Sequence, residues 1–306
     1  MSTLFLSSSD CERHNMGPSH PESPDRLNSI NTMMLNTDWD NSLIQKQAPL
    51  LDPRDLVSIH PLDHVNAILE RIPDEGLVYL EADTAINPHS VNAALHAAGA
   101  GIFATDQVLA GSAENAFCSV RPPGHHAEST IAMGFCVFNS VALAAQRALA
   151  SGLSRVAILD FDVHHGNGTV EIFQHQPEVL VCSSFQHPFY PRRFDDVCLP
   201  NICLTPLQAG AASDNFRQAI ERDWLPAITQ HQPEMIFISA GFDAHQQDPL
   251  GGLNLIDNDY LWITELIVEQ ADKFAGGRVV SMLEGGYDLD ALARSVKMHL
   301  TGLLGI

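Results

Sequence analysis

The sequence predicts a single α/β domain built on a parallel β-sheet with helices on both faces. Short apolar runs alternate along the chain with longer segments of helical periodicity. Apolar runs without alternation are typical of parallel strands that are buried on both faces. Strands separated by helical crossovers predict such a sheet. Because no repeat, charge block or linker-like tract divides the 306 residues, we expect one domain over residues 1–306.

The expected elements follow one another in a regular order. A helix begins near Pro24, since proline is favoured in the first turn, and Ser90 is a candidate cap for an Ala-rich helix. Gly152 ends another helix. The strands are expected at 4–6, 116–120, 156–161, 179–183, 235–239 and 279–283. The helices are expected near 24–34, 60–71, 90–109, 141–150, 216–229 and 257–274.

The composition and charge narrow the functional classes. Hydrophobic residues make up 45% of the chain, which is typical of a globular protein with a large core. Against 16 Lys and Arg stand 37 Asp and Glu, a formal net charge of −21. This balance argues against a nucleic-acid partner, which requires clustered cations. It favours either cationic ligands or an acidic surface that keeps the protein soluble.

The lack of recognisable targeting signals and the isolated cysteines predict a cytoplasmic protein. No stretch approaches the roughly 18 apolar residues of a membrane span, so we expect no membrane partner, and the N-terminus lacks the basic and apolar regions of a signal peptide. The six cysteines occur singly, without a Cys-x-x-Cys pair. We therefore expect reduced, mostly buried thiols.

The strongest functional motif is DFDVHHGNGT, which begins at Asp160 directly after a predicted strand. Asp162 and His164 lie two residues apart, so on an extended chain both point to the same side as Asp160. A carboxylate oxygen and an imidazole nitrogen are suitable ligands for a divalent metal such as zinc. An isolated Asp-x-His is more often a polar strand-to-loop junction, but the density of polar groups here favours a metal site.

A candidate third ligand follows another strand. Asp243 lies in the segment SAGFDAH after the strand at 235–239. Three protein ligands leave a position open for water, which is the arrangement of catalytic zinc sites. Taken alone, this Asp would more often cap a helix.

Two adjacent histidines follow the strand at 116–120. His125 and His126 lie in a loop held by Pro and Gly residues, and they suit either metal ligation or acid/base chemistry. Asp160 and Asn167 are available to orient their rings, which favours proton transfer. Tyr287 follows the last strand in LEGGYD, where its hydroxyl can serve a developing oxyanion or where it can simply be a half-buried turn residue.

Together these motifs resemble the histone deacetylase family, in the branch shared by class II deacetylases and bacterial amidohydrolases. The resemblance covers nearly the whole chain. It also includes HPESPDRL at 20–27, GFCVFN at 134–139 and DPLGG at 248–252. It implies the three-layer arginase/deacetylase α/β fold, with a central eight-stranded parallel sheet.

The resemblance implies a zinc-dependent amidohydrolase, with Fe²⁺ as an alternative to Zn²⁺. The implied metal ligands are Asp162, His164 and Asp243. His126 would act as general base and then as general acid, while His125, paired with Asp160, would be mainly electrostatic. Tyr287 would share with the metal the stabilisation of the oxyanion.

Further sites follow from the same resemblance. Phe135 and Tyr190 would wall a narrow acyl-lysine tunnel, with the Gly134 carbonyl receiving the substrate N–H and Leu250 at the rim. A structural K⁺ would use Asp160, Asp162, His164, Ser183 and Ser184. A second monovalent site would use Phe173, Gln176 and Val179.

Several positions distinguish this chain within the family pattern. Asn167 stands where class I members carry Asp, so the pKa of His126 should be raised less strongly. Phe185 stands where relatives often have His, and the loop at 189–194 lacks the Gly-rich continuation usual after its Pro. Leu250 stands where polyamine-selective relatives have Glu. Glu81 or Asp83 is a candidate for holding the substrate backbone or a cationic tail, although either can be a solvated surface residue.

The leading hypothesis is therefore removal of an acetyl or other short acyl group from acyl-lysine. An acetylpolyamine is the second choice of substrate, because the chain is strongly acidic. A catalytically silent acyl-lysine-binding scaffold and a dinuclear manganese hydrolase of the arginase type are the alternatives from other classes. The sequence leaves the acyl length, the physiological substrate and the oligomeric state open.

Overall fold

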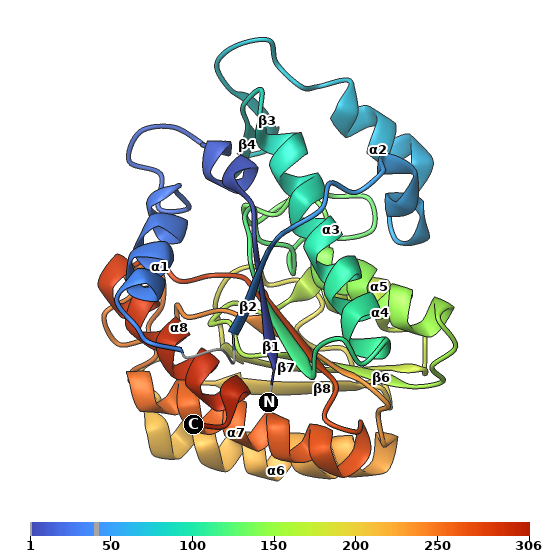
Figure 1. Cartoon of the computed structure of the whole chain (residues 1–306), viewed down its shortest axis with the longest axis vertical. Helices are drawn as coiled ribbons and strands as arrows, with labels where there is room; N and C mark the ends of the chain where they lie inside the picture. Colours follow the sequence, from blue (N-terminus) through green and yellow to red (C-terminus); the bar gives the residue numbers. More distant parts are fainter. Residues whose placement is uncertain (1, 40–42) are drawn as a thin grey trace.

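Eight parallel strands form the central sheet, and helices cover both of its faces (Figure 1). The computed structural model describes residues 2–39 and 43–306. The strand order across the sheet is β2-β1-β5-β10-β9-β6-β7-β8. The eight-stranded sheet with helices on both faces confirms the predicted fold class. The strands are β1 (Thr3–Ser7), β2 (Leu43–Gln47), β5 (Asn115–Ser119), β6 (Val156–Asp160), β7 (Val179–Gln186), β8 (Ile202–Leu207), β9 (Ile236–Ala240) and β10 (Val279–Leu283).

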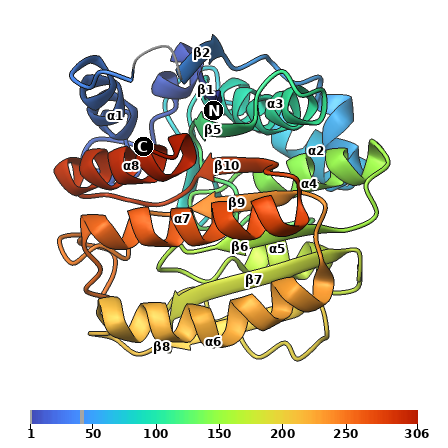
Figure 2. The same cartoon turned by 60° about the horizontal axis from the view of Figure 1, so that its bottom comes forward.

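Two groups of helices enclose the sheet. Helices α6, α7 and α8 lie over one face, where α1 packs against α8, and α3, α4 and α5 pack against the other (Figure 2). The helices are α1 (Asp25–Leu35), α2 (Leu62–Leu69), α3 (Ser90–Leu109), α4 (Ser140–Ala150), α5 (Asn167–Phe173), α6 (Ser213–His231), α7 (Asp257–Phe274) and α8 (Leu289–Leu304). Two 3-10 helices, η1 (Ser9–Arg13) and η2 (Pro53–Ser58), and a hairpin of β3 (Val78–Glu81) and β4 (Thr84–Ile86) complete the described chain.

The sequence missed two edge strands of this sheet. β2 has the polar sequence LIQKQ and is largely exposed, so it carries none of the apolar signal of a buried strand. β8 contains Pro206, which cannot donate a ladder hydrogen bond and is tolerated mainly at an edge. Ser90 was predicted to cap α3, but it is the first residue of the helix, and His89 occupies the cap position. The Ser90 hydroxyl accepts a hydrogen bond from the backbone N–H of Asn87, which precedes the helix, at 2.8 Å.

The sheet order gathers the predicted functional motifs. β5, β10, β9 and β6 are consecutive neighbours, and all of their pairings are parallel. Their carboxyl ends therefore lie at one edge of the sheet, where α/β folds bind their ligands. The loops after these four strands carry the tandem histidines, Tyr287, Asp243 and the Asp162/His164 motif, respectively.

The structure shows the state of the cysteines and the character of the helices. All six cysteines lie in the described part of the chain and are free, four of them buried. Among the described residues, no helix is both long enough and apolar enough to cross a bilayer.

A buried histidine joins α8 to the sheet. His299 is fully enclosed, with Nδ1 2.6 Å from the Thr264 hydroxyl of α7 and Nε2 2.8 Å from the Ser281 hydroxyl of β10. Thr264 donates its own proton to the Tyr260 carbonyl, so His299 Nδ1 donates and Nε2 accepts. Burial lowers the pKa of His299 to about 3, and the ring is neutral in the folded protein.

We predict that His299 makes the fold sensitive to mild acid. Its folded pKa lies below the unfolded value, so its contribution is complete above about pH 6.5 and is lost as the pH falls toward the folded pKa. Between pH 7 and 5 this group alone should cost about 2 kcal/mol of unfolding free energy. Urea unfolding of wild type and His299→Gln at both pH values measures it. The exposed His175→Gln is the control, and equal pH sensitivity of all three proteins would contradict the prediction.

Candidate active site

Three donor atoms converge at the carboxyl ends of β6 and β9. Nδ1 of His164 lies 3.1 Å from Oδ1 of Asp162 and 3.1 Å from Oδ2 of Asp243. The three side chains offer ligand atoms that all lie within 4.8 Å of one another. Among the described residues, no other group of three His, Cys, Asp or Glu side chains comes together in this way. The structure thus brings together the three residues that were predicted as metal ligands.

The chemistry of this donor set suits zinc. Two carboxylate oxygens and one imidazole nitrogen are ordinary zinc ligands, and three of them leave one position open. Burial and the neighbouring Asp162 raise the pKa of Asp243 to about 7. Burial opposes a charge on His164, yet its bonds to the two carboxylates raise its pKa to about 10. The site therefore favours positive charge between the two carboxylates, as a divalent cation would supply.

Backbone groups fix the carboxylate oxygens that face away from the convergence point. The Val163 N–H donates to Oδ1 of Asp243, and the Gly285 N–H donates to Oδ2 of Asp162, each at 2.9 Å. Such outer contacts orient metal ligands and are part of the site. Each of the three strand-end loops is thereby held to another one.

Two glycines permit this close approach. A Cβ at Gly241 would meet Oδ2 of Asp162 at 2.1 Å, and a Cβ at Gly285 would meet Oδ2 of Asp243 at 2.1 Å. Both distances are far inside van der Waals contact. Any side chain at either position would displace a predicted metal ligand, which explains why GFD and GGY carry glycine there.

The tandem histidines have different partners. Nδ1 of His125 donates to Oδ2 of Asp160 at 2.9 Å, whereas Nδ1 of His126 lies 2.7 Å from Oδ1 of Asn167. The two rings are 4.0 Å apart between centroids. Burial alone would lower the pKa of His125, but Asp160, Asp162 and Glu284 outweigh it and raise that pKa well above its usual value.

The pKa of His126 moves in the opposite direction. Burial, the neighbouring His125 and His164 lower it well below its usual value. The neutral amide of Asn167 supports the ring without supplying a full negative charge. The structure therefore pairs one cationic imidazole with one neutral imidazole.

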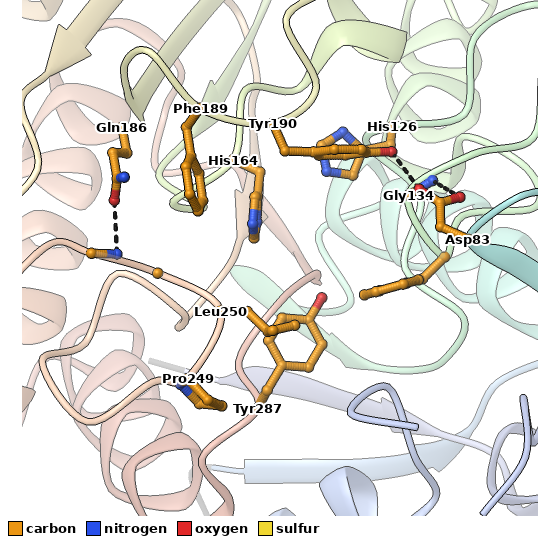
Figure 3. Close-up of a pocket in the computed structure, with 13 residues that line it drawn as sticks. Asp83, His126, Gly134, His164, Gln186, Phe189, Tyr190, Pro249, Leu250 and Tyr287 are labelled. Carbon is orange, nitrogen blue, oxygen red and sulfur yellow. Dashed lines mark hydrogen bonds between the residues drawn. The ribbon is translucent and has the colours of Figure 1, made fainter. Parts of the chain in front are cut away.

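Tyr287 lies across the cavity from the histidines, with its hydroxyl pointing toward the interior (Figure 3). Its backbone N–H donates to Oδ2 of Asp248 at 2.6 Å. The guanidinium of Arg26 lies 5.0 Å from the centre of its ring, and Phe135 meets it edge-on at 6.0 Å. Burial raises the pKa of Tyr287 well above its usual value, so the phenol keeps its proton and can donate it in a hydrogen bond.

One cavity of about 600 Å³ opens onto these groups. Its walls include all four residues predicted to contact substrate, namely Gly134, Phe135, Tyr190 and Leu250. Asp83 also lines it and accepts hydrogen bonds from the Tyr190 hydroxyl at 2.7 Å and the Gly134 N–H at 3.1 Å (Figure 3). Glu81 is exposed and does not line the cavity.

Five other cavity residues were not predicted as substrate contacts, although three of them, Pro249, Gly251 and Gly252, belong to the DPLGG motif. Phe189 stacks on the His164 ring at 5.4 Å between centroids and 16° between planes. Gln186 also lines the cavity and accepts a hydrogen bond from the Gly252 N–H at 2.7 Å. The aromatic residue directly before Tyr190 was the available signal for Phe189, whereas nothing near Gln186 distinguished it from the rest of β7.

A family model described as a histone deacetylase domain matches residues 20–303. The chain belongs to the histone deacetylase family. It is 40% identical to an uncharacterized protein of Synechocystis over 98% of this chain and 99% of the relative. It is also 36% identical to the histone deacetylase-like amidohydrolase of Pseudomonas aeruginosa, over 88% of this chain and 72% of the relative.

A solved structure of the same family shows the same fold. The crystal structure of the HDA15 HD domain matches with a TM-score of 0.91 and 32% identity, over 99% of this chain and 90% of that one. Family membership makes this protein a hydrolase of the deacetylase type. Because the family is generally zinc-dependent and the Asp162, His164 and Asp243 donors suit zinc, we assign these three residues as the candidate metal site.

The residues predicted for the first K⁺ site come largely from β6 and β7, next to the predicted zinc ligands. Asp160 and Ser183 are register partners on β6 and β7, and the Ser184 hydroxyl donates to the Asp160 carbonyl at 3.5 Å. Ser183 meets Nδ1 of His165 at 3.0 Å. The structure thus places these predicted residues side by side, and K⁺ binding stays a prediction.

The second predicted monovalent site contains an amide. Nδ2 of Asn201 lies 2.9 Å from the Phe173 carbonyl, 3.1 Å from that of Gln176 and 3.1 Å from that of Val179. These carbonyls belong to the three residues predicted for the second monovalent site, so the amide nitrogen lies where a cation bound by them would. As arranged here, they do not fit a bare monovalent ion. The residue responsible went unnoticed because nothing in its local sequence marks it.

We predict that removing this amide creates a response to K⁺. Asn201→Ala removes the side-chain donor of three carbonyls, two of which keep a backbone donor, so it should cost about 1 kcal/mol of unfolding free energy. K⁺ should recover part of that loss, because it can occupy the vacated position. Urea unfolding in potassium chloride and in tetramethylammonium chloride measures the recovery. The exposed Asn254→Ala is the control, and a response to K⁺ no larger than that of wild type would contradict the prediction.

Proposed function

We propose that this protein is a zinc-dependent deacylase that removes an acetyl or other short acyl group from the side-chain amine of acyl-lysine. One observation carries the proposal. A cavity with aromatic walls is lined by His164, His126 and Tyr287, and directly behind them lie the two carboxylates that complete the zinc-type ligand set and the second, differently held imidazole. Each of these groups has a role in amide hydrolysis. The ligands bind the metal, the imidazoles supply charge and transfer protons, and the tyrosine hydroxyl stabilises the oxyanion.

The cavity walls position the substrate. The methylene chain of an acyl-lysine lies between the rings of Phe135 and Tyr190, where burial of apolar surface holds it. The carbonyl of Gly134 faces the amide N–H. A substrate held in this way presents its acyl carbonyl to the metal ligands and to Tyr287, which replaces an encounter in solution with a fixed geometry.

The imidazoles and the tyrosine carry the proton and charge movements. Bound zinc would polarise the acyl carbonyl and lower the pKa of a water molecule. His126 takes a proton from the attacking water on Nε2, since Nδ1 is committed to Asn167, and returns it to the leaving amine. The Tyr287 hydroxyl donates a hydrogen bond to the oxygen that becomes negatively charged.

The rim favours acyl-lysine over the alternative substrate. Leu250 presents an apolar side chain at the cavity mouth, which offers no charge for the distal ammonium of a polyamine. An acetylpolyamine is the second candidate, because the net charge of −21 attracts polycations and Asp83 places a carboxylate at the wall. Asp83 already accepts three hydrogen bonds within the protein, from the Tyr190 and Thr84 hydroxyls and the Gly134 N–H, so it is less available to a ligand.

We predict that Tyr287→Phe lowers turnover while the protein keeps its metal. Removing one oxyanion donor commonly costs roughly 10²–10³-fold in kcat. Steady-state kinetics on a fluorogenic acetyl-lysine peptide and metal analysis by mass spectrometry measure the two effects. Tyr79→Phe is the matched control, because Tyr79 is 58% exposed and lies outside the cavity.

Two outcomes would contradict this assignment. Near wild-type turnover of Tyr287→Phe would remove the hydroxyl from the mechanism. Asp243→Ala should lose stoichiometric zinc, and its retention would remove Asp243 from the metal site. Zinc bound to wild type without turnover of any acyl substrate would favour a silent acyl-lysine-binding scaffold.

We predict that kcat/KM is higher for the acetyl-lysine peptide than for N8-acetylspermidine. The apolar rim supplies the physical reason, and Leu250→Glu tests it because a carboxylate at the mouth would pair with the free ammonium groups of the polyamine. The variant should shift the ratio of the two kcat/KM values toward N8-acetylspermidine. A wild-type preference for N8-acetylspermidine would replace the proposed substrate with the alternative.

A further inference from the structure

The rim loop, residues 189–194, keeps a backbone shape that its sequence does not favour. It has no glycine, yet Arg192 and Phe194 both have φ of +56°. Residues with a side chain rarely adopt this left-handed conformation, and they keep it where surrounding contacts determine it. The residue between them, Arg193, makes the contact that fixes the loop.

Arg193 binds a buried carboxylate beside the tandem histidines. Its Nε and Nη2 atoms donate to the two oxygens of Glu128 at 2.6 and 2.7 Å. Glu128 is 3% exposed and lies two residues after His126. A paired fork of this kind is a strong and directional form of ion pair. Beside it, the Phe194 carbonyl lies 3.2 Å from Nε2 of His165, which gives the loop a second attachment.

Glu128 continues this contact to the proposed general base. Its Oε1 atom also accepts a hydrogen bond from Nδ2 of Asn167 at 2.7 Å. Oδ1 of the same amide lies 2.7 Å from Nδ1 of His126. An unbroken series of short hydrogen bonds therefore runs from the rim loop through Glu128 and Asn167 to His126.

The series determines which nitrogen of His126 carries the proton. The Arg193 guanidinium binds both oxygens of Glu128 and so holds the carboxylate in place against Asn167. A carboxylate has no proton to donate, so it can only accept from the Asn167 amide. The amide must then turn Nδ2 toward Glu128 and Oδ1 toward His126. His126 consequently holds its proton on Nδ1 and keeps the lone pair of Nε2 free. Without a fixed acceptor, the Asn167 amide could turn over and favour the other tautomer.

We propose that Arg193 and Glu128 are positioning residues that hold the Asn167 amide in one orientation and thereby hold His126 in the tautomer that accepts a proton on Nε2. This inference rests on the proposed function of His126 as general base. It assigns a purpose to the Arg-Arg-Phe segment, which departs from the Gly-rich continuation of the family. The loop at the cavity mouth is thus connected to proton transfer at the cavity floor.

The first test separates turnover from substrate binding. Arg193→Ala in the zinc-loaded enzyme should lower kcat about tenfold, a fraction of the 10²–10⁴ that a positioned acid/base group contributes. KM should change by less than threefold, and Arg193→Lys should recover part of the loss. Arg192→Ala is the matched control, because Arg192 is the exposed neighbour on the same loop, and it should stay within twofold of wild type.

The second test reports the tautomer without any substrate. Nitrogen NMR of zinc-loaded protein with ¹⁵N-labelled histidine distinguishes protonated from bare ring nitrogens, and a His126→Ala sample assigns the signals. Wild type and Arg192→Ala should show Nδ1–H for His126. Glu128→Gln should show a mixture of tautomers, since a glutamine can present either its oxygen or its nitrogen to Asn167. Arg193→Ala should show a mixture as well, since Glu128 is then no longer held against the Asn167 amide.

The outcomes separate this inference from the proposed function. If Arg193→Ala changes KM but leaves kcat and the tautomer unchanged, Arg193 only shapes the rim and the inference is wrong. If the tautomer shifts in a protein that turns over no acyl substrate, the inference holds for the imidazole while the proposed function fails. Should Glu128→Gln not fold, Arg193→Ala alone decides, because half of the Arg193 side chain is in solvent and its removal leaves no cavity in the core.

Discussion

The two buried carboxylates of Asp162 and Asp243 are the constraint on which the site depends. They follow neighbouring strands of the sheet and share Nδ1 of His164. Like charges that are withdrawn from water repel strongly unless positive charge lies between them. Backbone N–H groups of Val163 and Gly285 satisfy the outward-facing oxygens, and the inward-facing oxygens of the two carboxylates converge on Nδ1 of His164, where a cation would lie. The strand-end glycines are there because the carboxylates come so close to the backbone.

The same negative charge explains why two adjacent imidazoles behave differently. His125 has the Asp160 carboxylate at Nδ1 and lies close to Asp162, and these charges overcome its burial. His126 has a neutral amide in the corresponding position, and burial prevails. Neighbouring groups whose environments push their pKa values apart are the usual arrangement for dividing electrostatic and proton-transfer roles. One substitution, a neutral Asn167 in place of a carboxylate, is enough to make the division sharp.

The sequence predicted the central strands of the sheet better than the strands at its two edges. Strands β6, β9 and β10 are continuous apolar runs, so their ends and the polar motifs behind them were visible without a structure. The edge strands β2 and β8 lack that pattern because one side of each has no neighbour to pack against. The partners of Glu128 and Asn201 were invisible for another reason. Arg193 lies 65 residues beyond Glu128, and the three carbonyls that meet Asn201 belong to the backbone, which has no signature in a sequence.

The arrangements at Arg193 and Asn201 follow the same physical principle. In one, a side chain holds a loop that glycines would leave free, and in the other an amide fills a position expected for a cation. A free ion stabilises a protein by an amount that rises with the logarithm of its concentration relative to its dissociation constant, and it stabilises little when that concentration is low. A covalently attached amide is always present, although its two protons must serve three carbonyls. The end of α5 and the start of β7, which the Asn201 amide joins, should therefore hold their arrangement without a bound monovalent cation.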